Sequence, residues 1–240
     1  MRLIALLILL IIGAASAQAQ EPVSFTTSDG ITVYGDYYAA DDAARPIILA
    51  FHQANYNRLE YREIAPRLVK LGLSVLAIDQ RSGGNYGGEE NRTAKESKAF
   101  WTYTDALPDL EAALEWARAK HPKSKIIAWG SSYSASLVIV LAAKSHDVAG
   151  VMAFSPGEYF DGKPSVMAAA RKVTVPAFIT SAGGEEVGVA RMIFKALASS
   201  DKMQFVPERF GVHGSSALLQ PQGKSDEYWK AVETFLAKFD

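Results

Sequence analysis

The feature of this sequence that most constrains its fold is a repeated alternation of short apolar runs with helical segments. The runs Pro46–Phe51, Leu73–Ile78 and Val148–Phe154 are apolar almost throughout, which is typical of strands that are buried on both faces. Between such runs lie stretches with helical spacing, of which Ser132–Lys144 is the most apolar. This alternation predicts a mostly parallel central sheet with helices on both faces.

The remaining expected elements extend the same pattern along the chain. An early strand is expected at Val23–Thr27, and Ile31–Ala39 is expected to form an edge strand beside it. Further strands are expected at Lys125–Trp129, Val175–Ser181 and Met203–Val206. Helices are expected at Arg58–Leu71, Asp105–Lys120, Pro164–Lys172, Val189–Ser199 and Glu227–Phe239. With 240 residues, of which 49% are hydrophobic and 21% charged, the chain is long enough to bury one sizeable core.

The start of the chain differs from the rest in composition. Arg2 precedes the apolar run Leu3–Ile12, and the small residues Ala15–Ala19 that follow offer sites for cleavage. This pattern predicts a secretory signal peptide at residues 1–19, followed by an exported domain, periplasmic or secreted, at residues 20–240. The alternative is a membrane anchor, but the apolar run is shorter than the ~20 residues that a span needs.

Composition also excludes several classes of function. The chain has no cysteine, which excludes disulfides, cysteine nucleophiles and thiolate-ligated metals. A net charge of −1 gives no basic surface for nucleic acid. The glycines of Asp79–Gly84 are followed by no lysine and do not form G-x-G-x-x-G, and there is no metal-binding motif of the H-E-x-x-H kind. We therefore expect no cofactor, no metal and no nucleic-acid partner, and the oligomeric state stays open.

The sequence Gly130–Ser134 lies between an expected strand and an expected helix and reads Gly-Ser-Ser-Tyr-Ser. It is close to the nucleophile turn G-x-S-x-G, with Ser134 in place of the last glycine. A sharp turn brings strand and helix together, so small residues are needed on either side of the central serine. The turn exposes the hydroxyl of Ser132, the predicted nucleophile, and directs the Tyr133 N–H into the same space. The alternative is a serine-rich helix cap without chemistry.

This turn, the glutamates Glu185 and Glu186, the histidine His213 and the Asp79 segment together resemble the α/β-hydrolase superfamily. Within it, the chain is most similar to small bacterial hydrolases related to dienelactone hydrolase. The resemblance implies an α/β-hydrolase fold. Residues 155–174 leave no room for a large cap domain, so an open, shallow cleft is implied. Dienelactone hydrolases proper use a cysteine nucleophile, which this chain lacks.

A serine hydroxyl needs a base, and the chain has four histidines. In the α/β-hydrolase order of serine, acid and histidine, only His213 can serve, because it lies between the last strand and the last helix. His52 precedes the nucleophile and is interpreted as a structural residue that shapes its loop. His121 and His146 are expected at the surface.

The acid of the triad is expected after the strand Val175–Ser181. Glu185 is favoured because such an acid is usually followed by one residue and then an aliphatic one, here Val187. Glu186 is the alternative acid, and Asp161, after the preceding strand, is a third. A carboxylate in this place orients the imidazole and stabilises its cation.

An oxyanion needs two donors, and the Tyr133 N–H is expected to be one. The second is expected from the loop after the strand Pro46–Phe51, as the backbone N–H of Gln53 or Ala54. The resemblance then implies acyl transfer on a small-molecule carboxylic ester through an acyl-enzyme. Thioesterases, peptidases and cofactor-free haloperoxidases would use the same triad, and a non-catalytic binding protein could use the same scaffold.

Overall fold

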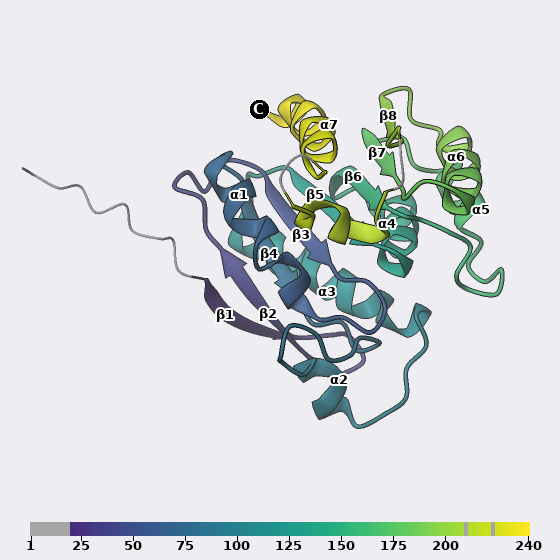
Figure 1. Ribbon diagram of the computed structural model, residues 1–240. Coiled ribbons are helices and arrows are strands. Elements are labelled where there is room, and N and C mark those ends of the chain that lie inside the picture. The colour runs from purple at the N-terminus through teal and green to yellow at the C-terminus, as the bar shows by residue number, and fades with distance from the viewer. Residues whose placement is uncertain (1–19, 209–210, 222–223) are drawn as a thin grey trace, which may run out of the picture.

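The computed structural model describes residues 20–208, 211–221 and 224–240, so the predicted signal peptide lies outside the described residues. An eight-stranded sheet runs through the molecule in the order β1-β2-β4-β3-β5-β6-β7-β8 (Figure 1). β2 runs antiparallel to both β1 and β4, and the pairs from β4 to β8 are all parallel. The strands are β1 (Glu21–Thr26), β2 (Thr32–Tyr38), β3 (Ile47–Phe51), β4 (Ser74–Ile78), β5 (Ile126–Ser131), β6 (Val148–Phe154), β7 (Ala177–Thr180) and β8 (Lys202–Phe205).

The predicted mostly parallel sheet is confirmed, but the predicted place of one strand in it is wrong. Residues 32–38 do not form an edge, because β2 pairs with β1 on one side and with β4 on the other. The edge strands are β1 and β8. The short N-terminal segment therefore takes the edge position and covers the backbone groups that β2 would otherwise expose.

Helices cover both faces of the sheet, as predicted. The longer α-helices are α3 (Leu107–Lys120), α4 (Tyr133–Lys144), α6 (Glu185–Ala196) and α7 (Asp226–Leu236), and the shorter ones are α1 (Ile64–Lys70), α2 (Arg92–Ser97) and α5 (Val166–Ala170). Short 3₁₀ helices are η1 (Arg58–Tyr61), η2 (Thr104–Ala106), η3 (Gly214–Leu219) and η4 (Ala237–Phe239). The sequence predicted one helix at 58–71, which the structure divides into η1 and α1, and it did not predict α2.

Two apolar layers hold these helices on the sheet. Helices α3, α4, α5 and α6 pack with Ile47, Leu49 and Phe51 on one face, whereas α1 and α7 pack with Ile48 and Ala50 on the other. All five residues of β3 are fully buried, because side chains alternate between two covered faces. Figure 1 shows α5 and α6 together near the β8 end of the sheet.

The connection from β6 to β7 carries only the short helix α5, so no large cap covers the ends of the strands, as expected. Within the part of the chain that the structure describes, no helix has both the length and the hydropathy that a membrane span requires.

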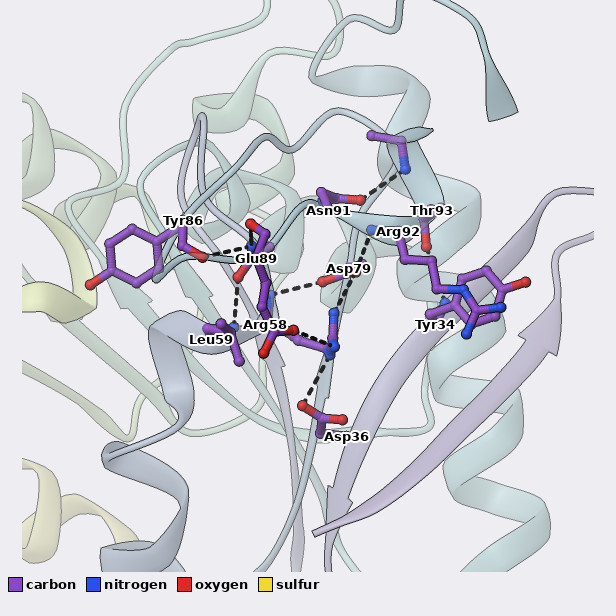
Figure 2. A network of polar contacts seen from close by, with 12 residues as sticks. Tyr34, Asp36, Arg58, Leu59, Asp79, Tyr86, Glu89, Asn91, Arg92 and Thr93 are labelled. Atoms are coloured by element: carbon purple, nitrogen blue, oxygen red, sulfur yellow. Dashed lines mark hydrogen bonds and ion pairs between the residues drawn. The ribbon is translucent and has the colours of Figure 1, made fainter. Parts of the chain in front are cut away.

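A buried ionic network ties β2 to the segment after β4 (Figure 2). The guanidinium of Arg58 lies 2.8 Å from Asp79 and 3.0 Å from Asp36. Asp79, fully buried, also accepts hydrogen bonds from the backbone N–H groups of Arg58 and Arg92. Burial raises the pKa of Asp79, and Arg58 acts in the opposite direction. The network therefore fixes the start of η1 and the start of α2 on the sheet.

We predict that Asp79→Ala lowers the free energy of unfolding by about 3 kcal/mol, because it leaves a partly buried guanidinium and two N–H groups without their acceptor. Urea denaturation measures this change. The matched control is Glu90→Ala, whose ion pair with Lys95 is exposed and should contribute less than about 1 kcal/mol. Equal stability of the two variants would contradict the role given to Asp79.

The passage from β5 to α4 depends on a close backbone approach at Gly130. A Cβ atom at this position would collide with the carbonyl group of Ser134, the second residue of the following helix. Glycine is therefore required here for space, since its φ angle lies outside the left-handed region.

Gly130→Ala should destabilise the fold by about 3 kcal/mol, because both colliding atoms belong to the backbone and neither can turn away. Gly188→Ala is the matched control, since Gly188 lies within α6 and a Cβ there meets no atom within 4 Å. That variant should be more stable by about 0.5–1 kcal/mol. Thermal unfolding of both variants tests the pair, and a Gly130→Ala protein as stable as the parent would disprove the close approach.

Candidate active site

Ser132 lies between β5 and α4 in a backbone conformation that side chains rarely adopt. Its φ is 59° and its ψ is −122°, and its N–H donates to the Phe154 carbonyl across 2.8 Å. A non-glycine residue with positive φ costs free energy and persists only where the surroundings hold it. Such a strained strand-to-helix turn is the geometry of a serine nucleophile.

Ser134, the departure from glycine in this turn, has polar partners of its own. Its hydroxyl donates to the His52 carbonyl across 2.6 Å and accepts from the Gln80 side chain across 2.7 Å. The crowding in the turn is against the backbone of Ser134, so its side chain is free to make these bonds. A serine therefore fits here and ties the turn to the loop after β3.

His213 lies directly before η3, and its Nδ1 is 2.6 Å from the carboxylate of Glu186. The other oxygen of Glu186 accepts from the Ser155 hydroxyl at 2.7 Å and from the Ala182 N–H at 3.1 Å. Burial acts to raise the pKa of Glu186, but the hydrogen bonds from His213 and Ser155 outweigh it, so this pKa lies below its usual value. Glu186 is thus an ionised partner for the imidazole.

The structure brings together His213 and Glu186, the alternative acid, rather than the favoured Glu185. Helix α6 begins at Glu185, and successive residues of a helix point about 100° apart, so only one of the two glutamates can face the histidine. The side chain of Glu185 is exposed. Asp161, the third option, is also exposed, in the connection between β6 and β7.

Ser155, the first residue after β6, is a member of the site that the sequence analysis missed. It adopts φ 59°, and its hydroxyl donates to Glu186 and accepts from the Gly214 N–H at 3.0 Å. Ser155 therefore joins the start of α6, which carries Glu186, to the segment that carries His213. Its position directly after a strand of the parallel sheet was the available signal.

Contacts between their neighbours bring Ser132 and His213 to the same place. The Ser131 hydroxyl accepts from the Ser215 N–H across 2.8 Å, and Gly214 lies so close to this hydroxyl that a Cβ would collide with it. No hydrogen bond between Ser132 and His213 occurs among the described residues.

The expectation that the Gln53 N–H serves an oxyanion is wrong. This N–H donates to the carboxylate of Glu60 across 2.8 Å, a fully buried group that the sequence analysis did not consider. For the N–H groups of Ala54 and Tyr133, by contrast, no acceptor is found within the described residues. Ala54, the alternative donor, is therefore the one that remains available beside Tyr133.

His52 holds the loop after β3 in place, as expected. Its Nε2 accepts from the Gln80 N–H at 3.0 Å, so its Nδ1 carries the proton and donates to the Gln53 carbonyl at 2.9 Å. Burial lowers the pKa of His52 to about 4, which keeps the ring neutral. Of the two histidines expected at the surface, His146 is exposed, but His121 is buried and bonded to the Tyr37 hydroxyl at 2.8 Å.

A cleft of about 560 Å³ opens beside Tyr133, the residue that follows Ser132. Its lining includes Tyr103, whose ring stacks on Tyr133 with centroids 4.4 Å apart, and Tyr159, whose hydroxyl donates to the Ser155 carbonyl across 2.9 Å. Phe100 and Trp101 add further apolar surface. Across the described part of the chain, no cluster of three or more histidines and carboxylates could hold a metal.

Comparison with known proteins identifies the family of the chain. Residues 42–178 match the family described as serine aminopeptidase, S33. Polyketide transferase af380 of Aspergillus fumigatus is 28% identical over 175 residues, which are 70% of this chain and 56% of that protein. Quorum-quenching protein AidA of Acinetobacter baumannii is 28% identical over 154 residues, 63% of this chain and 48% of that protein. The chain thus spans about half the length of these curated relatives.

Solved structures share the fold over nearly the whole chain. The Pyrococcus furiosus esterase Pf2001 matches with a TM-score of 0.73 at 20% identity, over 92% of this chain and 93% of the other. Dienelactone hydrolase from Anabaena variabilis matches with a TM-score of 0.72 at 19% identity, over 93% and 99%. The family match covers more than half of the chain, and the sheet has the α/β-hydrolase architecture. The chain therefore belongs to the serine aminopeptidase S33 family of hydrolases, within the α/β-hydrolase superfamily.

Proposed function

We propose that this hydrolase is an exported serine esterase with Ser132 as nucleophile, His213 as general base and Glu186 as the acid of the triad. The observation that carries the proposal is the 2.6 Å bond between His213 and Glu186 on the loops that flank the strained Ser132 turn. An ionised carboxylate on Nδ1 fixes the proton there and leaves Nε2 as the acceptor.

The mechanism that we propose is acyl transfer in two steps. His213 Nε2 takes the proton of Ser132 as Oγ attacks the substrate carbonyl, and the N–H groups of Ala54 and Tyr133 hold the resulting oxyanion. The imidazolium, stabilised by Glu186, then gives its proton to the leaving alcohol, and an acyl-enzyme remains. Water activated by His213 releases the carboxylic acid and restores Ser132. Before attack, Ser132 must form a hydrogen bond with His213.

A carboxylic ester of a small molecule is the substrate class that we favour. Esterases are among the proteins with the same fold, and the cleft beside Ser132 has no large cap over it. The second candidate is a small peptide amide, which the family description favours and which the same triad would cleave. A non-catalytic role on this scaffold is the third, and labelling of Ser132 distinguishes it from the other two.

The proposal of export rests on the sequence of residues 1–19, where a basic start, an apolar run and small residues follow one another. N-terminal sequencing of the protein recovered outside the cytoplasm tests it. A mature chain that begins near residue 20 would support export, and an intact Met1 in the cytoplasm would contradict it.

We expect a fluorophosphonate probe to label the parent protein at Ser132 and to leave Ser132→Ala unlabelled, because only an activated serine reacts. Hydrolysis of p-nitrophenyl esters from acetate to decanoate should fall by at least about 1,000-fold in Ser132→Ala. Ser131→Ala is not a neutral control, because Ser131 contacts Glu60, so Ser145→Ala, at the end of α4, serves instead. A folded parent without labelling or turnover would disprove the esterase proposal.

The two neighbouring glutamates provide a matched test of the acid. Glu186→Gln should lower kcat by about 1,000-fold or more, since an amide on Nδ1 can favour the wrong tautomer of His213. Glu185→Gln should keep kcat within about twofold, because this side chain is exposed on the adjacent helix position. Steady-state kinetics on one ester decides between them, and a larger loss in Glu185→Gln would restore the acid that the sequence favoured.

A further inference from the structure

Glu60, in η1, is a fully buried carboxylate that the proposed triad does not use. One of its oxygens accepts from the Gln53 N–H at 2.8 Å. The other accepts from the Gln53 side-chain amide at 3.0 Å and from the Ser131 hydroxyl at 2.8 Å. All its partners are donors, so their arrangement suits an ionised carboxylate.

Through these partners Glu60 connects the separate parts of the site. Gln53 lies directly before Ala54, the remaining oxyanion donor, and Ser131 lies directly before Ser132. The Ser131 hydroxyl also accepts from the Ser215 N–H, and the Gln53 amide also donates to the Ser216 hydroxyl at 3.0 Å. Both of these residues follow His213 in η3. One carboxylate thus contacts the oxyanion loop and the nucleophile turn and reaches the histidine loop through a single further bond.

The position of Glu60 is itself fixed on both sides. Two residues earlier, Arg58 is bound to Asp79 and Asp36, as Figure 2 shows. One residue later, the Tyr61 hydroxyl donates to the Phe51 carbonyl at the end of β3, at 2.8 Å. These contacts fix the position of Glu60 in η1, so the loop that contains Gln53 takes the conformation that reaches the carboxylate.

We propose that Glu60 is a positioning residue of the esterase, whose ionised carboxylate holds the Gln53 N–H and thereby turns the Ala54 N–H toward Ser132. The inference rests on the proposed function, since it concerns the oxyanion site of that reaction. When Glu60 takes up a proton, one of its oxygens becomes a hydroxyl, and the carboxyl group loses its charge. The bonds from the Gln53 N–H and the Gln53 amide are then weakened, and the oxyanion loop is held less firmly.

The pKa of Glu60 lies close to neutral pH. Burial raises its pKa to about 7, and the bonds from Gln53 and Ser131 and the nearby His213 act against this rise. The charge of Glu60 also contributes to raising the pKa values of the Tyr61 and Tyr86 hydroxyls. Because the folded pKa lies above the usual 4.5, Glu60 is about half ionised near pH 7, and the ionised form is lost as the pH falls through that value.

This predicts that activity depends on the ionised form of Glu60. In the parent, kcat/KM should fall as the pH decreases through about 7, whereas Glu60→Gln takes up no proton at this position and should lack this part of the acid limb. Its kcat should fall by about 10- to 100-fold, with KM within about twofold, because one buried donor loses its acceptor and the oxyanion forms only after binding.

The experiment measures p-nitrophenyl butyrate hydrolysis by the full chain from about pH 5 to about pH 9, for the parent, Glu60→Gln and Glu63→Gln. Glu63 is exposed, three residues after Glu60, and its variant should match the parent in rate and in pH profile. Thermal unfolding and circular dichroism confirm that each variant is folded. Unchanged kcat in folded Glu60→Gln, or the same acid limb in this variant as in the parent, would overturn the role of Glu60.

A second variant keeps the test decisive if Glu60→Gln does not fold. Ser131→Ala removes one donor from the carboxylate, so the pKa of Glu60 should rise and the acid limb should move to higher pH. An acid limb at the same pH in that variant would overturn the proposal. Turnover and Ser132 labelling in the parent separate the esterase proposal from the role of Glu60. If the parent shows neither, both proposals are wrong. If the parent is active but the Glu60 and Ser131 variants behave like it, only the role of Glu60 is wrong.

Discussion

The contact between Gly130 and the backbone of Ser134 is the constraint on which the rest of the site depends. It lets β5 pass directly into α4, and this passage forces Ser132 into a positive φ with its hydroxyl at the carboxyl end of the sheet. The strain is held by the layers of apolar side chains on both faces of the sheet, which leave strand and helix no room to separate. The packing of the core and the geometry of the Ser132 turn therefore depend on each other.

Buried polar groups fix the loops around the site in this protein, which has no disulfide. Asp79 holds η1 and the start of α2, His52 holds the loop after β3, and Glu60 joins that loop to the Ser132 turn. Each of these groups is completely buried and has partners of the opposite hydrogen-bonding character. A polar group in such a place is costly unless its bonds are complete, so these groups favour one arrangement of the loops over all others.

Ser134, which replaces the last glycine of the nucleophile turn, and Gln53, in the loop where hydrolases of this type often have glycine after the histidine, have a common physical role. Ser134 in place of glycine, and Gln53 in the loop after β3, both supply hydrogen bonds between segments that would otherwise only touch. The side chain of Gln53 reaches Glu60 and Ser216, and that of Ser134 reaches His52 and Gln80. A glycine could make neither set of bonds, so these residues strengthen the site rather than impair it.

The sequence by itself determined the alternation of strands and helices, and with it the parallel sheet, because apolar periodicity reports local burial on one or both faces. It also singled out Ser132 and His213, because the order of elements along the chain places their loops at one edge of the sheet. Only the tertiary structure showed that Glu186, and not Glu185, pairs with His213, since the choice depends on where α6 begins. It alone revealed that Glu60 occupies the Gln53 N–H and that Ser155 is bonded to Glu186. These contacts depend on how the loops fold against one another, and no local pattern encodes which buried polar groups will meet.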